Sequence, residues 1–428
     1  STLFPYTTLF RSFGTLRDYR LRVVKTMVGG LAGLLAHRGI TVFRANAAFH
    51  ADETAPATSN HIVHLVPSPD QSDILTYHKA DVPEPSGPTM DLTATNIVIA
   101  TGAKPRPLPG NPFAGALIDS TQALEVNEFP SSAVIIGAGA IALEFASMWN
   151  AAGSKVTLLI RKDRVLSAWD RRAGTTLTRE LKRHGVNIIT RASVTHVDTG
   201  ANLGATVHYT REGQDGEQSV WGEIALVAIG RDPITDPAWG VTIDDHGHVA
   251  TDAYGRTDKP GVWAVGDVTA GHALAHRAFE QGIVIAETIA GLNPKPVDEA
   301  TVPQIVFSFP EAASVGLTVE QAQAREDLIE IKETNYPMLA NARMLMSGTA
   351  GSLTIVSGCD ATNPDTPRVL GVHMVSQMAS DIIAEAEQLV GNRVPLADAA
   401  RLVHPHPTFS ETLGEALLKA DGRPLHTR

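Results

Sequence analysis

The feature that most restricts the fold of this 428-residue chain is a glycine-rich turn between an apolar strand and a helix. Strand, turn, helix and second strand follow one another closely, and this order predicts a βαβ unit with parallel strands. The unit comprises, in order, an apolar run at 133–136, the turn residues Gly137, Gly139 and Ala142, a helix over about 141–152, Gly153 as its cap, and a strand at 156–160.

The small residues of this turn suit a bound dinucleotide. Gly137 allows the tight turn, Gly139 allows a pyrophosphate to approach the backbone, and Ala142 allows the helix to pack closely against the strand. The helix N-terminus then faces the phosphates. We therefore predict a nucleotide site here, with a purely structural glycine turn as the alternative.

The residues after the second strand predict which nucleotide binds. NAD enzymes normally carry an acidic residue about 20 residues beyond the turn, where it binds the ribose hydroxyls. In this chain Ile160 occupies that place, and Arg161 and Lys162 follow it. Because guanidinium and ammonium groups suit a 2′-phosphate, the sequence favours NADP(H) over NAD(H). A solvated basic loop is the alternative.

Hydrophobic patterns outside this unit predict further domains. Residues 21–38 carry apolar side chains at helical spacing, and a strand follows at 40–43. Beyond Pro303, segments of alternating polarity predict an antiparallel sheet, with helices such as 380–390 on one of its faces. A chain of this length is expected to divide into roughly three domains.

Two other strands end in residues that suit a second cofactor. An apolar run at 96–100 leads into Gly102, and a strand at 262–265 ends in Gly266 and Asp267. The Asp267 carboxylate stands between a strand and a helix, where it can accept a hydrogen bond from a polyol. A Gly-Asp pair is also common in ordinary turns.

The segment from His404 to Glu411 predicts acid–base chemistry on a thiol. An imidazole beside a carboxylate becomes more basic and is held in one orientation, which equips His406 to take a proton from a thiol. Pro407 fixes the backbone after His406, and Glu411 follows close enough in sequence to pair with it. A structural histidine is the alternative.

Charge and composition exclude several functions. The net charge of -11 disfavours nucleic acid as a partner, and the most apolar stretch, residues 23–35, is too short for a membrane span. The single cysteine, Cys359, excludes a disulfide within the chain. Because the sequence also has no signal-peptide pattern, we expect a cytoplasmic protein.

The first residues differ in character from the rest of the chain. Residues 2–12 resemble the translation of a sequencing adapter. We therefore expect residues 1–12 to be non-native and the original start of the gene to be missing, with a β-prone native segment as the alternative.

The ordered motifs resemble the class I pyridine nucleotide-disulfide oxidoreductases, the family of dihydrolipoamide dehydrogenase, glutathione reductase and mercuric reductase. The resemblance runs from about Leu21 to the end of the chain. It rests on residues 100–102, the turn at 137–142 with Glu144, residues 230–233, residues 261–267, residues 309–311 with 315–316, and residues 404–411.

The resemblance implies an α/β fold with two Rossmann-like domains, for FAD and for NAD(P), and a C-terminal α+β dimerisation domain. The implied boundaries are 13–128 for a partial FAD-binding domain, 129–256 for the NAD(P)-binding domain, 257–300 for the rest of the FAD-binding domain and 301–428 for the dimerisation domain.

The resemblance also implies roles for single residues. His406 and Glu411 would act as acid and base at the flavin site of the partner in a homodimer. The FAD contacts would be Gly102, Gly266 and Asp267. The contacts to the nicotinamide cofactor would be Gly137, Gly139, Ile141, Ala142, Glu144, Arg161, Lys162 and Gly230.

The sequence departs from this family in two respects. The family carries an N-terminal Gly-rich FAD loop and a Cys-x4-Cys redox pair, and neither occurs in this sequence. The chain as written is therefore expected to bind FAD poorly and not to reduce a disulfide.

Several functions fit the resemblance. Residues 274–282 resemble dihydrolipoamide dehydrogenase, whereas residues 160–166 resemble the NADPH loop of glutathione reductase. We favour an FAD-dependent NAD(P)H dithiol-disulfide oxidoreductase of the first kind, acting on a small-molecule dithiol or disulfide. The alternatives are a glutathione-type or mercuric-type reductase, a cysteine-free NAD(P)H:quinone reductase and, in another class, an inactive nucleotide-binding fragment.

Overall fold

The structure is a computed structural model that describes residues 13–50, 60–77, 84–200, 204–348 and 350–427. Contacts within the chain divide it into two compact units. The first comprises Ser1–Lys104 and Asp232–Val297, and the second comprises Pro105–Arg231 and Asp298–Arg428. The adapter-like segment, residues 1–12, lies outside the described residues.

The first unit begins with the long helix α1 (Phe13–His37), which confirms the helix expected at 21–38 and extends it toward the N-terminus. Two small antiparallel sheets follow, in the orders β1-β4-β5 and β2-β3-β6. Their strands are β1 (Val42–Arg44), β2 (Asn46–Phe49), β3 (His61–Val66), β4 (Leu75–Tyr77), β5 (Glu84–Pro85) and β6 (Met90–Ala94).

A pair of parallel strands leads into the residues expected to bind a second cofactor. Strand β7 (Ile97–Ile99) pairs with β18 (Val262–Ala264), and helix α5 (Ala275–Ile289) follows β18 after the short helix η3 (Gly266–Val268). The buried side chains Ile99, Val262 and Val268 form part of a core that also includes Trp239 of η2 (Pro237–Trp239). The strands predicted at 96–100 and 262–265 are therefore confirmed.

The second unit contains the predicted βαβ unit, which is confirmed almost residue for residue. A five-stranded parallel sheet has the order β12-β11-β10-β16-β9. The elements are β9 (Leu117–Ile118), α2 (Ser120–Leu124), β10 (Ser132–Ile136), α3 (Ala140–Ala151), β11 (Lys155–Ile160), α4 (Arg171–Arg183), β12 (Asn187–Thr190) and β16 (Ile224–Val227).

Helix α3 is anchored to this sheet by apolar side chains. Leu143 and Trp149 of the helix are fully buried, and they belong to one core with Leu158 of β11 and Leu177 of α4. Burial of such large apolar side chains contributes roughly 1.5–3 kcal/mol each to folding. This packing fixes the N-terminus of α3 at the end of β10.

A three-stranded antiparallel sheet, β13-β14-β15, leads from β12 back to β16. Its strands are β13 (Ala192–Asp198), β14 (Ala205–Arg211) and β15 (Gln218–Gly222). The register between β13 and β14 shifts by one residue between Val194 and His196, which makes Thr195 the extra residue of a β-bulge. Two short strands, β8 (Ala103–Pro105) and β17 (Arg231–Pro233), lie where the chain passes between the two units.

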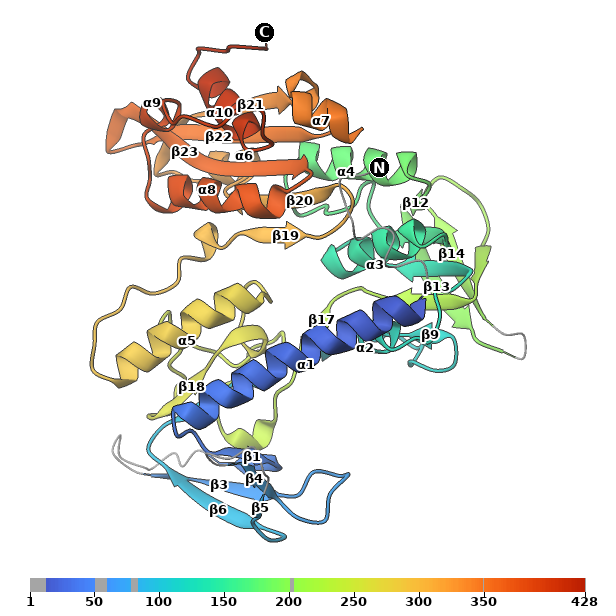
Figure 1. Cartoon of the computed structure of the whole chain (residues 1–428), viewed down its shortest axis with the longest axis vertical. Helices are drawn as coiled ribbons and strands as arrows, with labels where there is room; N and C mark the ends of the chain where they lie inside the picture. The colour runs from blue at the N-terminus through green and yellow to red at the C-terminus, as the bar shows by residue number, and fades with distance from the viewer. Residues whose placement is uncertain (1–12, 51–59, 78–83, 201–203, 349, 428) are drawn as a thin grey trace. The chain divides into compact units, whose positions relative to one another are not determined.

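The C-terminal part of the second unit is the predicted antiparallel sheet with helices. Its order is β19-β20-β23-β22-β21, and α8 and α10 pack against it (Figure 1). The strands are β19 (Gln304–Val306), β20 (Glu311–Gly316), β21 (Leu328–Pro337), β22 (Ser352–Asp360) and β23 (Asn363–Ser376). The helices are η4 (Glu299–Thr301), α6 (Val319–Gln323), η5 (Met338–Ala340), α7 (Ala342–Ser347), α8 (Ala379–Gly391), α9 (Leu396–Ala399) and α10 (Glu411–Ala420).

Among the residues that the structure describes, no helix combines the length and the hydropathy needed to cross a membrane.

Candidate functional site

The glycine-rich turn lies at the end of β10, and backbone contacts require its first glycine. Gly137 has φ of +139°, and a Cβ there would stand 2.2 Å from the carbonyl oxygen of Ala228. Gly139 is the N-cap of α3, and a Cβ there would meet nothing within 4 Å. Ala142 is fully buried beside Gly137, as expected of a small residue that packs helix against strand.

A cavity of about 580 Å³ opens in front of this turn, entirely within the second unit. Its volume is in the range of small-molecule and cofactor sites. The lining residues from the turn and from β11 are Ile136, Gly137, Ala138 and Leu159. The others are Arg106, Leu108, Pro109, Arg161, Lys162, Ser167, Ala192, Ser193, Val194 and Ile229.

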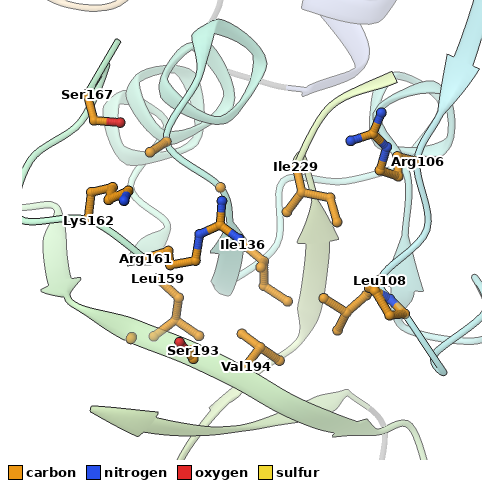
Figure 2. A pocket seen from close by; sticks show the side chains of 14 residues that line it. Arg106, Leu108, Ile136, Leu159, Arg161, Lys162, Ser167, Ser193, Val194 and Ile229 are labelled. Carbon is orange, nitrogen blue, oxygen red and sulfur yellow. The ribbon is translucent and has the colours of Figure 1, made fainter. Parts of the chain in front are cut away.

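Three cationic side chains line the cavity. Arg161 and Lys162 follow the end of β11, as the sequence places them, and both are exposed. Figure 2 shows Lys162 and Arg106 on opposite sides of the cavity, with the Arg161 guanidinium between them in this view. The sequence did not identify Arg106, because no motif marks a residue that lines the cavity from about 30 positions before the glycine turn.

Gly230 and Glu144, also implied by the resemblance, are not among the residues that line the cavity. The Gly230 carbonyl accepts a hydrogen bond from the Arg106 N–H at 3.1 Å. The Glu144 carboxylate, on α3, accepts from the Phe307 N–H at 3.1 Å, and its burial raises the pKa of that carboxyl. Ile141 is half-buried in the first turn of α3 and packs against the core of the sheet.

The three residues predicted to contact FAD lie together in the first unit. Gly102 has φ of +72° and its carbonyl accepts from the Ile234 N–H. Gly266 has φ of +76°, is buried, and donates its N–H to the Gln281 side chain at 3.0 Å. Asp267 is the second residue of η3, and Val265 alone separates η3 from β18. The left-handed conformation at both glycines is the backbone geometry that favours glycine over other residues.

The His406 and Glu411 side chains form a hydrogen-bonded pair in the second unit. Nδ1 of His406 lies 2.8 Å from Oε2 of Glu411, and the His406 side chain is 76% exposed while that of Glu411 is 16% exposed. The second Glu411 oxygen accepts from the Asn341 amide at 2.7 Å. Glu411 is the first residue of α10, so His406 precedes the helix and its side chain contacts the helix's first residue. This arrangement presents an oriented imidazole to solvent.

A second histidine–carboxylate pair lies deeper in the same segment. Nε2 of His404 is 2.8 Å from Oε1 of Glu385, and the His404 side chain is only 9% exposed. The hydrogen bond that His404 donates to the Glu385 carboxylate raises the pKa of His404 above its usual value. Gly414 of α10 packs directly on the His404 ring, since a Cβ there would stand 2.3 Å from Nδ1. His404 is therefore a structural residue that supports the His406 segment.

The His404–Glu385 pair predicts a pH-dependent contribution to stability. Because the pKa of His404 is raised by folding, the contribution is complete below pH 6.5 and is lost as the pH rises through the folded-state pKa. We expect Glu385→Gln to lower the free energy of unfolding by about 1–3 kcal/mol at pH 6 and by less at pH 9. Urea denaturation at the two pH values measures this difference. An equal loss at both would contradict it.

Cys359 is fully buried in β22, and burial raises the pKa of its thiol. A protonated, inaccessible thiol is a poor nucleophile. Cys359 is thus a core residue and does not supply a redox thiol.

These features define a dinucleotide-binding α/β protein with a C-terminal α+β domain. A family model described as pyridine nucleotide-disulphide oxidoreductase matches residues 4–282, and the model of that family's dimerisation domain matches residues 302–417. The chain belongs to the pyridine nucleotide-disulphide oxidoreductase family, and within it is dihydrolipoyl dehydrogenase-like.

Curated relatives and solved structures agree with this assignment. The dihydrolipoyl dehydrogenase of Cupriavidus necator is 37% identical over 341 residues, which cover 78% of this chain and 70% of that protein. The dihydrolipoyl dehydrogenase of Geobacillus stearothermophilus is 31% identical over 419 residues, which cover 97% and 81%. The structure of LpdA from Mycobacterium tuberculosis aligns with a TM-score of 0.73 at 25% identity, covering 87% of this chain and 76% of that one.

Proposed function

We propose that this chain is an FAD-dependent NADP(H) oxidoreductase of the dihydrolipoyl dehydrogenase kind, as the names of its relatives suggest, and that its substrate is a small-molecule dithiol. Because the sequence has no Cys-x4-Cys pair, the proposal for this chain is direct oxidation of the dithiol and not reduction of a disulfide. The observation that carries the proposal is the cavity that joins Gly137 to Arg161 and Lys162. The open space at Gly139 admits a pyrophosphate, and the two cations bind a 2′-phosphate.

Residues 129–256 are proposed as the NAD(P)-binding domain, residues 13–128 and 257–300 as the FAD-binding parts, and residues 301–428 as the dimerisation domain. FAD, when bound, would exchange two electrons with the nicotinamide cofactor as a hydride. Gly102, Gly266 and Asp267 would bind it, since two glycines in left-handed conformation let a ligand approach the backbone and Asp267 can accept from a hydroxyl. The matched dimerisation domain supports a homodimer.

The His406–Glu411 pair is proposed to move the proton of a substrate thiol. Oxidation of a dithiol to a disulfide releases two protons and two electrons. FAD, when bound, would take up the two electrons with one proton. Nε2 of His406 would take the other proton, that of the first thiol, and Glu411 would stabilise the resulting imidazolium at Nδ1. Because Cys359 is buried, the thiols are those of the substrate.

The cofactor preference can be tested at the cavity. We expect Arg161→Ala to reduce the preference for NADPH over NADH by about 10- to 100-fold, because a charge-assisted contact to the 2′-phosphate is lost. Dissociation constants for both nucleotides, measured by calorimetry, give this ratio. Arg179→Ala is the matched control, since that arginine is exposed on α4, outside the cavity lining. An unchanged ratio in Arg161→Ala would refute the NADPH assignment.

A second candidate function is NAD(P)H:quinone reduction, favoured by the single buried cysteine. The FAD-loaded chain separates the two functions in one assay. We expect dihydrolipoamide to drive reduction of NADP⁺, because His406 serves a substrate thiol. Rapid NADPH oxidation by a benzoquinone without any turnover of dihydrolipoamide would favour the second candidate.

A further inference from the structure

The outward face of the β13-β14-β15 sheet carries a cluster of histidines and carboxylates that none of the proposed roles uses. His196 on β13 lies directly opposite His208 on β14, and Asp198 follows two residues after His196. Residues two apart on a strand point to the same face, so all three side chains share one face. Val197 and Val207 point the other way, into the core.

The bulge at Thr195 creates this arrangement. Val194 before the bulge packs against the core, and Val197 after it does the same, although the two are three residues apart. Without the extra residue, simple alternation would turn one of them outward. The bulge therefore places His196 and Asp198 on the solvent side, beside His208.

The ligand atoms of the three side chains lie close together. Nε2 of His208 is 3.0 Å from Oδ2 of Asp198, and Nε2 of His196 is 3.9 Å from the same oxygen. One nitrogen from each ring and the carboxylate oxygen all lie within 4.8 Å of one another. The two imidazole rings are stacked, with centroids 4.0 Å apart and planes inclined by 7°.

A second carboxylate borders the other edge of the stacked rings. Oxygens of Glu217 lie 3.8 Å from Nδ1 of His196 and 3.6 Å from Nδ1 of His208. The Thr195 hydroxyl donates to Glu217 at 2.7 Å. In this structure Nε2 of His208 is within hydrogen-bond distance of Asp198 and donates its proton there, so a metal ion would displace that proton. A shift of Glu217 by less than about 1 Å would let it accept from the Nδ1–H groups, which is how an outer carboxylate orients metal-binding histidines.

We propose that His196, Asp198 and His208 bind a divalent transition-metal ion, with Glu217 as the carboxylate that orients the two imidazoles. Two imidazole nitrogens and one carboxylate oxygen suit Zn²⁺ and Cu²⁺, and a water completes a four-coordinate site. Tetrahedral ligands at about 2.0–2.1 Å stand roughly 3.3 Å apart. The present separations bracket that value.

Small side-chain rotations complete the coordination. His196 is 47% exposed and Asp198 is 65% exposed, so neither is held in place by core packing, whereas His208 is 22% exposed and supplies the fixed ligand. A tilt of the His196 ring out of the stack turns its Nε2 toward the same point as that of His208. The proposal involves no residue of the cofactor cavity or of the His406–Glu411 pair, so it stands independently of the proposed function.

Calorimetric titration of the metal-stripped chain with ZnCl₂ tests the site. We expect one tight Zn²⁺ per chain, and at least about a tenfold weaker affinity in His208→Asn. His64→Asn is the matched control, because His64 also faces a carboxylate across two antiparallel strands, with Nδ1 2.6 Å from Asp91, but has no second histidine opposite it. This control should keep the wild-type affinity.

Two further measurements keep the result decisive. His196→Asn changes the more exposed ligand, so it tests the site even where His208→Asn disturbs folding, as judged by circular dichroism. With Cu²⁺ as a second probe, electron paramagnetic resonance should detect coupling to two imidazole nitrogens, reduced to one in His196→Asn. Equal Zn²⁺ affinity in wild type and His196→Asn would show that the cluster is only a set of ordinary histidine–carboxylate pairs, and would overturn the proposal.

Discussion

Replacing Gly137 by alanine is expected to destabilise the second unit by about 3 kcal/mol or more and to abolish detectable NADPH binding. The new methyl group would stand 2.2 Å from the Ala228 carbonyl oxygen and would hold alanine at φ of +139°. Neither problem is relieved by a rotation, since both involve backbone. Urea denaturation and nucleotide titration measure the two effects.

Gly139→Ala is the matched comparison for Gly137→Ala. A Cβ at Gly139 meets no atom of the protein within 4 Å, and the residue lies in extended backbone with φ of -92°. We expect stability to stay near wild type while NADPH binds more weakly, because the methyl group enters the space proposed for the pyrophosphate. Normal NADPH affinity in Gly139→Ala would contradict the placement of the nucleotide.

The second large effect is expected at His406. We expect His406→Ala to lower dihydrolipoamide-dependent reduction of NADP⁺ by about 10²- to 10⁴-fold, the usual contribution of a general base. Reduction of a benzoquinone by NADPH should be unchanged, because that reaction needs no thiol proton to be removed. Steady-state rates with the two substrates, using the FAD-loaded chain, give the comparison.

A nearby pair supplies the control for His406. His426 also lies 2.8 Å from a glutamate of α10, Glu415, and is similarly exposed, with 66% of its side chain accessible. His426→Ala removes an equivalent surface pair without touching the proposed site, so both activities should persist. If His426→Ala and His406→Ala lose the same activity, the loss reports on α10 as a whole and the acid–base role fails.

The βαβ unit was predictable because its signals are local. The apolar run, the glycine turn and the capping residue Gly153 each act within a few residues, and β10, α3 and β11 begin and end within one residue of the predicted bounds. The strands β13 and β15 and the helix α4 were not identified from the sequence. Their positions depend on pairing and packing with distant segments, which short-range patterns do not record.

The residues of the candidate site were also predictable only where the sequence signal is local. The pairing of His406 with Glu411 was foreseeable because only about five positions separate the two residues in sequence. Asn341 and Glu385, which hold Glu411 and His404, come from elsewhere in the C-terminal domain and carry no sequence signal. The histidine cluster on β13 and β14 was missed because it depends on a bulge, which shifts the pattern of alternation by one residue.

The strand order β12-β11-β10-β16-β9 means that the residues that form the sheet are different from the residues proposed to select the coenzyme. The chain leaves β10 toward β11 on one side and later returns to β16 on the other, so the end of β10 is a switch point where a crevice forms whatever side chains border it. Buried Ile160 completes β11, and the exposed Arg161 and Lys162 come after it. The proposed coenzyme preference is therefore expected to change by substitution at this rim at little cost in stability.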